Sequence, residues 1–509
     1  MHDFWRRSII LRDVITRITQ VWYRIPQRHT LLWGMVVVAV PILLGELLLR
    51  AIGGSYVELK PIYSDEVAYW LQGRAWYAAK LGAGYFSLNE RIAPLSWSHY
   101  GSHGVFVAMV YGIVDASRFD RIVVTNTVVF AVCGVAAAFI ARWSWREAVA
   151  SLTILCLFPF VITMMPASMQ EILHAGIAMV LAAGFARLLA GDGAVRVWVI
   201  LGIMLAMLLR PTWGILLIPA FVLYTPGMAW HLRGARMLIA GGVMLAMTLL
   251  MGATAAPYPT LRSGYYADLT GVSDLFGRMW EYTLYNLGTI MRPTRVVFTM
   301  QRVLAVLLVM GVTISWTFGN NTSSRPMIAT NELLLHLINI VGMYVAMLLL
   351  YEFIDGRDFR VVGAHLLFSV MLLILRQQWL LFYAVCAWSI LSLPSAWQHY
   401  QSVHAPRFAT TRTIPPLSHH LIYEAQHPSW CNTVEVSIDY VGGMNEVLLD
   451  IPPGFGLTVL TGVPPDTLHA KYLVLVDDQH ATLNETMTLT RLMPVRNGAL
   501  YRNENSDCP

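Results

Sequence analysis

The chain has 509 residues, of which 56% are hydrophobic and 13% are charged. Ordinary soluble domains are about 25% charged, so this composition excludes a soluble enzyme and predicts a polytopic membrane protein. The formal net charge of +5 is small for this length, and no basic run follows the N-terminal tail. Nucleic acid is therefore not an expected partner.

The N-terminal tail, residues 1–29, is rich in arginine and precedes a long apolar run at residues 31–49. No small-residue cleavage site follows this run, so it predicts a retained membrane anchor rather than a signal peptide. Because cytoplasmic segments of membrane proteins are enriched in Lys and Arg, we place the tail in the cytoplasm. Its arginines are Arg6, Arg7, Arg12, Arg17, Arg24 and Arg28.

Further apolar runs alternate with short and often basic links along the chain. Runs of about 20 apolar residues predict transmembrane helices. Pro211 is expected to separate two of them, because proline breaks a helix. The predicted spans, about eleven in all, are residues 31–49, 122–141, 148–166, 172–189, 197–209, 211–224, 237–256, 296–318, 333–351, 361–375 and 379–393. An odd number of spans places the C-terminal region outside the cytoplasm.

The spans and their links predict a membrane domain at residues 30–394, with long extracytoplasmic loops at 51–120 and 257–295. Residues 395–509 contain alternating runs such as "VEVSIDYV" and "KYLVLVDD" between Pro and Gly turns. This pattern predicts a small extracytoplasmic β-rich domain. Cys431 and Cys508 bracket most of it and are expected to form a disulfide in an oxidising compartment, with two unpaired thiols as the alternative.

The stretch "YSDEVAYW", residues 63–70, places two adjacent carboxylates in the first outer loop. Ser64 fits the N-cap of an amphipathic helix along the membrane surface, with Asp65 and Glu66 in its first turn. Acidic residues are favoured there by the helix dipole alone, so a purely structural role is one interpretation. An active-site role is the other.

A third outer carboxylate, Glu171, stands at the start of an inward-going span, and His103 lies in "SWSHYGSHG" of the first outer loop. Asp65, Glu171 and His103, with Glu66, could bind a hard divalent cation such as Mg²⁺ or Mn²⁺, or deprotonate an acceptor hydroxyl. The alternative is that these residues only make hydrogen bonds at the membrane interface.

Arginines also gather on the expected outer face. Arginine binds phosphate oxygens bidentately, so these side chains are candidates for holding a phosphate-bearing lipid. Simple solvation is the alternative, because long outer loops escape the positive-inside rule. The candidates are Arg74, Arg292, Arg295, Arg357 and Arg360, of which the last two lie in a short turn.

The order of these features resembles the GT-C glycosyltransferase superfamily over about residues 30–395. The resemblance rests on the first span, the Asp65-Glu66 helix start, "SHYGSHGVFVAMVYGIV", "LFPFVITMMPASMQEILHAGIAMVLAAGFARLLAG" and "LLRPTWGILLIPAFVLY". The most similar branch is that of protein O-mannosyltransferases and lipid A aminoarabinose transferases. Relatives commonly have His-Pro-Pro where this chain has His103-Gly104-Val105, and Asp where it has Glu171.

The resemblance implies transfer of a sugar from a polyprenyl-phosphate-type lipid donor to a glycan, lipid or protein acceptor outside the cytoplasm, usually with inversion. It implies that Asp65 is the catalytic base, Glu66 its neighbour and Glu171 the second acid, in a bacterial-type inner or plasma membrane. We expect substitution of Asp65 to affect turnover far more than folding, and substitution of Glu66 to affect both less. A transporter or flippase of a lipid-linked saccharide is the main alternative function, and a non-catalytic envelope assembly protein is the third.

Overall fold

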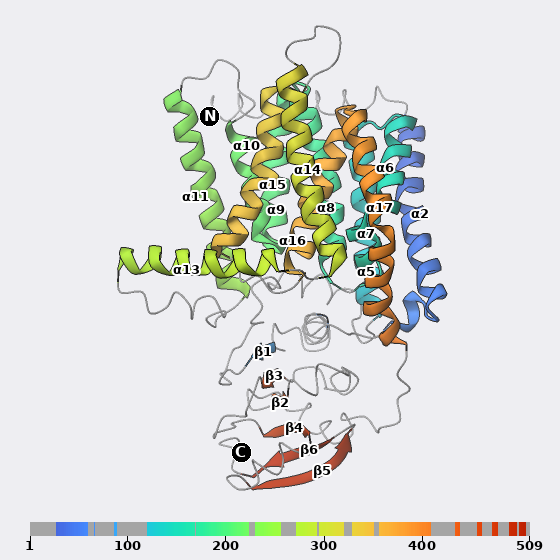
Figure 1. The fold of residues 1–509 in the computed structure, drawn as a ribbon, viewed down its shortest axis with the longest axis vertical. Coiled ribbons are helices and arrows are strands. Elements are labelled where there is room, and N and C mark those ends of the chain that lie inside the picture. Colours follow the sequence, from blue (N-terminus) through green and yellow to red (C-terminus); the bar gives the residue numbers. More distant parts are fainter. Residues whose placement is uncertain are drawn as a thin grey trace, which may run out of the picture.

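The computed structural model describes residues 27–59, 66, 86–88, 120–167, 169–222, 230–255, 271–292, 295–319, 328–350, 356–408, 433–437, 456–460, 471–476, 488–495 and 498–504. It consists of a bundle of apolar helices with a group of β-strands beyond one end of the bundle (Figure 1). We call this end of the bundle the strand side. The described part of the chain is thus that of a polytopic α-helical membrane protein with a β-rich C-terminal region.

Eight helices of the described ranges are long and apolar enough to cross a membrane. They confirm eight of the predicted spans. These helices are α2 (Gln27–Ala51), α5 (Asp120–Ala141), α8 (Glu171–Leu189), α11 (Trp230–Ala255), α14 (Val296–Gly319), α15 (Thr330–Leu350), α16 (Arg357–Leu375) and α17 (Trp379–His404).

The three remaining predicted spans are shorter or broken. The predicted span 148–166 divides into α6 (Trp145–Leu157) and α7 (Pro159–Met164), because Pro159 cannot continue the helix. As expected, Pro211 ends α9 (Arg196–Leu209) and begins the 3₁₀ segment η3 (Pro211–Leu216), which leads into α10 (Leu217–Val222). Three further 3₁₀ turns are η1 (Tyr56–Glu58), η2 (Gly193–Val195) and η4 (Ala405–Arg407).

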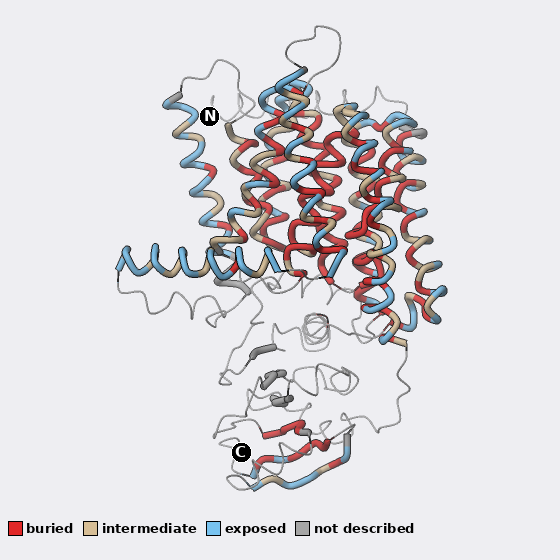
Figure 2. The backbone as a smooth tube through the Cα atoms, in the orientation of Figure 1, coloured by how far each residue is buried: buried red, intermediate tan, exposed pale blue. Residues whose placement is uncertain are grey.

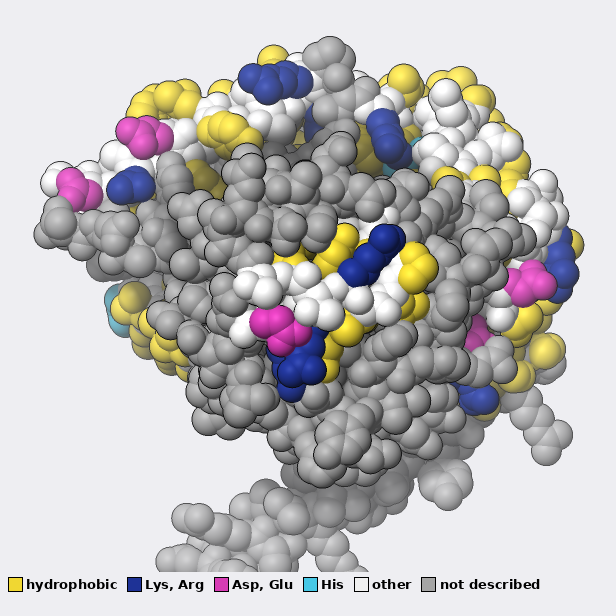
Figure 3. All heavy atoms as spheres, turned by 90° about the horizontal axis from the view of Figure 1, so that it is seen from below, with side chains coloured by type: hydrophobic (Ala, Val, Ile, Leu, Met, Phe, Trp, Pro, Cys, Tyr) yellow, Lys and Arg dark blue, Asp and Glu magenta, His cyan; other side chains and the backbone are white. Residues whose placement is uncertain are grey.

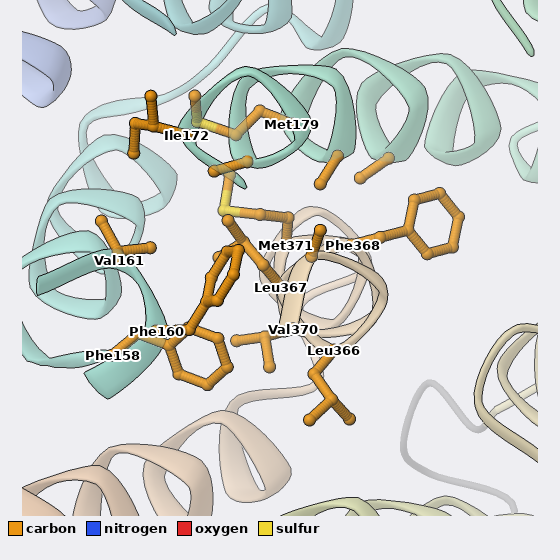
Figure 4. Packing of buried hydrophobic residues seen from close by; sticks show 14 of the residues in the cluster. Phe158, Phe160, Val161, Ile172, Met179, Leu366, Leu367, Phe368, Val370 and Met371 are labelled. Carbon is orange, nitrogen blue, oxygen red and sulfur yellow. The ribbon is translucent and has the colours of Figure 1, made fainter. Parts of the chain in front are cut away.

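The core of the bundle is built around α8 and α16. Buried aromatic and aliphatic side chains of α7, α8 and α16 fill the space between these helices (Figure 4). Phe160 of α7 packs against α16 so closely that a Cβ atom at Gly363 would lie 2.3 Å from its ring. The outer helices of the bundle, by contrast, carry many exposed residues (Figure 2). Many of these are large and apolar, as expected for helices that face lipid.

One helix does not follow the bundle. α13 (Val272–Met291) lies across the strand side, at a steep angle to the spanning helices (Figure 1). The sequence analysis assigned this region to a loop, because its Tyr, Arg and Gly residues hide the amphipathic pattern. α17 also differs in length, since it continues to His404 through the predicted domain boundary at residue 394.

The strands form one mixed sheet in the order β1-β3-β2-β4-β6-β5. The β-rich tail expected from the sequence supplies β2 (Thr433–Ser437), β3 (Gly456–Leu460), β4 (Tyr472–Val476), β5 (Leu489–Val495) and β6 (Gly498–Asn503). The edge strand β1 (Phe86–Leu88) comes instead from the first long loop and pairs in parallel with β3. The loop and the tail are therefore parts of a single sheet.

Candidate functional site

Three charged side chains meet at the strand side of the bundle. Glu171 Oε1 accepts a hydrogen bond from Arg210 Nη2 at 2.9 Å and another from Arg360 Nε at 3.0 Å. Glu171 is fully buried, the side chain of Arg210 is 6% exposed, and that of Arg360 is 26% exposed. We call these three residues the Glu171 cluster.

Each member of the Glu171 cluster stands at the end of a helix. Glu171 begins α8, Arg210 lies between the end of α9 and Pro211, and Arg360 is in the first turn of α16. The turn before α16 contains Gly356 with a φ of 78°, a left-handed conformation that favours glycine. Helix breaks at proline and glycine therefore bring the three charges together.

Two atoms of the Glu171 cluster are available to a ligand. Within the described part of the chain, Glu171 Oε2 and Arg210 Nη1 are buried and have no hydrogen-bond partner. Burial of unpaired polar groups is costly. An anionic ligand that accepts a hydrogen bond from Arg210 Nη1 would reduce this cost, and Glu171 Oε2 could accept one from a hydroxyl.

A polar network continues from the Glu171 cluster into the bundle. His174, one turn along α8, accepts a hydrogen bond at Nδ1 from Trp213 Nε1 at 3.0 Å. The Trp213 ring stacks on His365 with centroids 4.4 Å apart. His365 Nδ1 lies 2.8 Å from Asn339 Oδ1, and Asn339 Nδ2 donates to Ser369 Oγ. This network joins α8, η3, α15 and α16 behind the charged residues.

Glu66 has a different environment, in which it is fully buried against η4. Both of its carboxylate oxygens accept hydrogen bonds from Arg407, each at 3.0 Å. Arg407 Nε donates to His404 Nδ1 at 3.0 Å, and His404 Nε2 lies 2.8 Å from the carbonyl oxygen of Thr163. These contacts link the first loop to α17 and α7. They favour a larger role for Glu66 in folding than the sequence analysis expects.

The arginines predicted to bind a phosphate do not all lie at one site. Arg360 joins the Glu171 cluster, whereas Arg295 Nη1 contacts His399 Nδ1 at 2.8 Å and Ser402 Oγ at 3.2 Å on α17. Arg292 is exposed after α13, and Arg357 is half-buried at the start of α16. The other predicted site residues lie outside the described residues: Asp65, Arg74, His103, Cys431 and Cys508.

The described residues contain no group of three His, Cys, Asp or Glu side chains placed to hold a metal ion. Glu171, one of the predicted ligands, already contacts two guanidinium groups, which compete electrostatically with a cation. Ligation of Mg²⁺ or Mn²⁺ by Glu171 together with Asp65 and His103 stays a prediction.

Arg210 and Arg407 were not among the site residues predicted from the sequence. Arg210 did carry a signal, since it is a single arginine within the apolar stretch "MLLRPTWGILL". A charged residue in such a stretch is usually paired or functional. Arg407 carried no such signal, because its partner Glu66 is 341 residues away in the chain.

No protein-family model matches the sequence, and no curated protein matches it. Among solved structures, the chain is similar to the crystal structure of ArnT from Cupriavidus metallidurans in the apo state, with a TM-score of 0.39 and 12% sequence identity. The match covers 92% of this chain and 97% of that chain. A TM-score this low transfers no function to this chain, so a functional proposal has to start from the contacts on the strand side.

Proposed function

We propose that the chain is an integral-membrane glycosyltransferase that moves a sugar from a polyprenyl-phosphate-type lipid donor to an acceptor outside the cytoplasm. The observation that supports this proposal best is the buried Arg210 Nη1, which has no hydrogen-bond partner among the described residues and lies in the Glu171 cluster at the ends of bundle helices. A phosphate attached to a lipid would accept a hydrogen bond from this atom, and it would reach the cluster from the bilayer.

The arginines bind the phosphate of the lipid donor in this proposal. Arg210 offers its unpartnered Nη1, and the partly exposed Arg360 places the cluster within reach of the surface. Guanidinium groups bind phosphate oxygens bidentately and retain their charge in apolar surroundings. They would stabilise the phosphate that leaves when the sugar is transferred. Glu171 orients both guanidinium groups through one oxygen and keeps the other for a donor hydroxyl.

Asp65 activates the acceptor in this proposal. Its carboxylate would take the proton of the acceptor hydroxyl while the oxygen of that hydroxyl attacks the anomeric carbon of the sugar. A bond between the acceptor oxygen and the anomeric carbon forms, and the bond from that carbon to the phosphate oxygen breaks. Attack from the face opposite the phosphate inverts the anomeric configuration. A divalent cation, Mg²⁺ or Mn²⁺, remains part of the proposal, with Asp65 and His103 as its ligands.

The second candidate function is transport of a lipid-linked saccharide. It is favoured by the network of His174, Trp213 and His365, which places polar groups inside the bundle. Ionisable groups at such depth are common on transport pathways. The two candidates differ in chemistry, because a transporter leaves the bond between sugar and phosphate intact.

The test uses the purified full chain in nanodiscs with a panel of radiolabelled polyprenyl-phosphate sugars and extracts of envelope acceptors. We expect free polyprenyl phosphate and a labelled acceptor to appear together. Arg210→Gln should abolish turnover. Arg187→Gln serves as the control, because Arg187 pairs with Asp192 at the opposite end of the bundle. Movement of intact lipid-linked sugar across vesicles without release of polyprenyl phosphate would support the transporter and refute the transferase.

A further inference from the structure

The helix α13, which does not follow the bundle, has an exposed apolar face. Its large apolar side chains are exposed at intervals of three and four residues, the spacing of one helical face. These side chains, the apolar stripe of α13, are Phe276, Trp280, Leu284, Leu287 and Met291, with exposures between 45% and 77%. A surface stripe of this kind is not expected to face water.

A polar face lies on another side of the same helix. Asp274, Arg278, Glu281 and Tyr285 follow one another at the same helical spacing, and three of them are exposed. Seen from the strand side, the molecule shows charged groups together with exposed hydrophobic patches near its rim (Figure 3). α13 therefore separates an apolar side from a charged side, as helices at a membrane interface do.

Two contacts fix the C-terminal half of α13 to the bundle. Asn286 Nδ2 donates to the carbonyl oxygen of Leu348 in α15 at 2.8 Å. The carbonyl oxygen of Ile290 accepts a hydrogen bond from Arg302 Nη1 at 2.7 Å. Arg302 in turn binds both carboxylate oxygens of Asp358 at the start of α16. The other half of α13 extends sideways beyond the spanning helices (Figure 1).

The apolar stripe continues the lipid-facing surface of the bundle. α11, whose strand-side end reaches the level of α13 (Figure 1), has only 11% of its apolar window buried in the protein, and its Leu249 and Leu250 are exposed. A bilayer that covers α11 and the outer faces of α14 and α15 ends at the level of α13. Trp280 in the stripe fits this level, because tryptophan favours the boundary between acyl chains and headgroups.

We propose that α13 is an interfacial helix, seated in the membrane leaflet on the strand side with its apolar stripe among the lipid acyl chains. Asp274 and Glu281 face the headgroups and water. The occupant of the stripe is lipid, and the contacts of Asn286 and Ile290 hold the helix at this depth. This proposal is independent of the transferase activity, because it rests on the surface and contacts of α13 and on the apolar surface of the bundle.

The first test measures the surroundings of single positions in the full chain. Single cysteines at Phe276, Trp280, Asp274 and Glu281, in a background without the native cysteines, are spin-labelled in phosphatidylcholine nanodiscs. Val306 of α14, which is 57% exposed, gives the lipid-facing reference, and Arg502 of β6 gives the aqueous reference. Only variants that keep the thermal unfolding temperature of the parent enter the comparison.

We expect the ratio of oxygen to nickel-chelate collision rates to be several-fold higher at Phe276→Cys and Trp280→Cys than at Asp274→Cys and Glu281→Cys. The first pair should match the lipid reference and the second pair the aqueous one. Equal ratios at all four positions would refute the proposal. Low rates for both reagents, with dipolar broadening at the apolar positions, would show that a second copy of the chain covers the stripe and would also refute it.

A second test needs no substitution. Wild-type protein in nanodiscs that contain a diazirine-labelled phosphatidylcholine is irradiated, and the lipid adducts are mapped by mass spectrometry. We expect adducts on the apolar stripe and on the exposed face of α14. Adducts on α14 with none on α13 would contradict the interfacial position.

Discussion

Glu66 and Arg407 form a fully buried ion pair with two hydrogen bonds of 3.0 Å, although 341 residues separate them in the chain. The pair joins the first loop at Glu66 to η4, which follows α17. His404 extends the contact to α7, which ends shortly before Glu171. The carboxylate beside the proposed base therefore has a role in holding that segment in place.

Removal of one partner of this pair should destabilise the protein. Glu66→Ala removes both of these hydrogen bonds from the buried Arg407 charge, and removal of one partner of a buried pair costs about 3–5 kcal/mol. We expect a clearly lower thermal unfolding temperature in detergent. Arg50→Gln is the control, because Arg50 and Glu46 pair at the surface and such pairs contribute about 0–1 kcal/mol. Equal unfolding temperatures for Glu66→Ala and Arg50→Gln would contradict the prediction.

Substitutions of Asp65 and Glu66 should affect different properties, turnover for Asp65 and stability for Glu66. If Asp65 is the base, Asp65→Asn should lower turnover by about 10²- to 10⁴-fold, while its unfolding temperature stays near that of the parent. Glu66→Gln should lower the unfolding temperature more than it lowers turnover. Rates of polyprenyl phosphate release and thermal unfolding, measured on the same preparations, check this contrast. Normal turnover in Asp65→Asn would remove it from the role of base.

The activity should depend on the planar guanidinium group of Arg210 as well as on its charge. Arg210→Lys keeps a positive charge but loses the guanidinium geometry. Loss of one hydrogen bond to a charged group should lower kcat/KM for the lipid donor by about 10- to 100-fold. Arg295→Lys is a suitable comparison, because Arg295 binds His399 and Ser402 rather than Glu171. Similar values of kcat/KM in both variants would argue against a donor site at the Glu171 cluster.

Close packing between α7 and α16 should depend on Gly363. A Cβ atom there would lie 2.3 Å from the nearest ring carbon of Phe160, so Gly363→Ala should cost about 1–3 kcal/mol through overpacking. Phe160→Leu in the same chain should restore part of this loss. Gly242→Ala in α11 has open space around its Cβ and should be neutral or slightly stabilising. Thermal unfolding temperatures of the parent and of these three variants test the prediction. Equal unfolding temperatures for Gly363→Ala and Gly242→Ala would contradict it.

The pairing of β1 with β3 can be tested by cross-linking. Ser87 and Thr458 are register partners in neighbouring parallel strands, about 4.8 Å apart, which suits a disulfide. Ser87→Cys with Thr458→Cys should therefore cross-link under mild oxidation, as seen by gel mobility with and without reductant. Ser87→Cys with Leu460→Cys is the control, since that pair is separated by about 8 Å. Equal cross-linking in both pairs would contradict the register.

The parts of this structure that local sequence determines were predictable. Long apolar runs specify membrane helices, because lipid requires each segment to satisfy its own backbone hydrogen bonds. The break at Pro211 and the start of α8 at Glu171 followed from the chemistry of single residues. The strands of the tail followed from alternating side chains between turn residues.

The parts that depend on distant partners were less predictable. Arg360 was placed on the same outer face as Glu171 but not in contact with it, and Arg210 was missed, since helices far apart in the chain bring these residues together. β1 is only three residues long, too short for a reliable alternating pattern. α13 was hidden for another reason, because its glycines and tyrosines resemble those of a loop while its apolar stripe faces lipid.

The position of β1 also has a consequence for biosynthesis. Phe86–Leu88 leave the ribosome long before β3, Gly456–Leu460, and every helix from α5 to α17 is made between them. Contacts this distant in sequence form late and slowly. The edge strand must therefore wait, unpaired, until the last helix has entered the membrane and the tail has emerged. A chain that terminates before residue 456 would keep its bundle helices but expose a strand edge that has no partner.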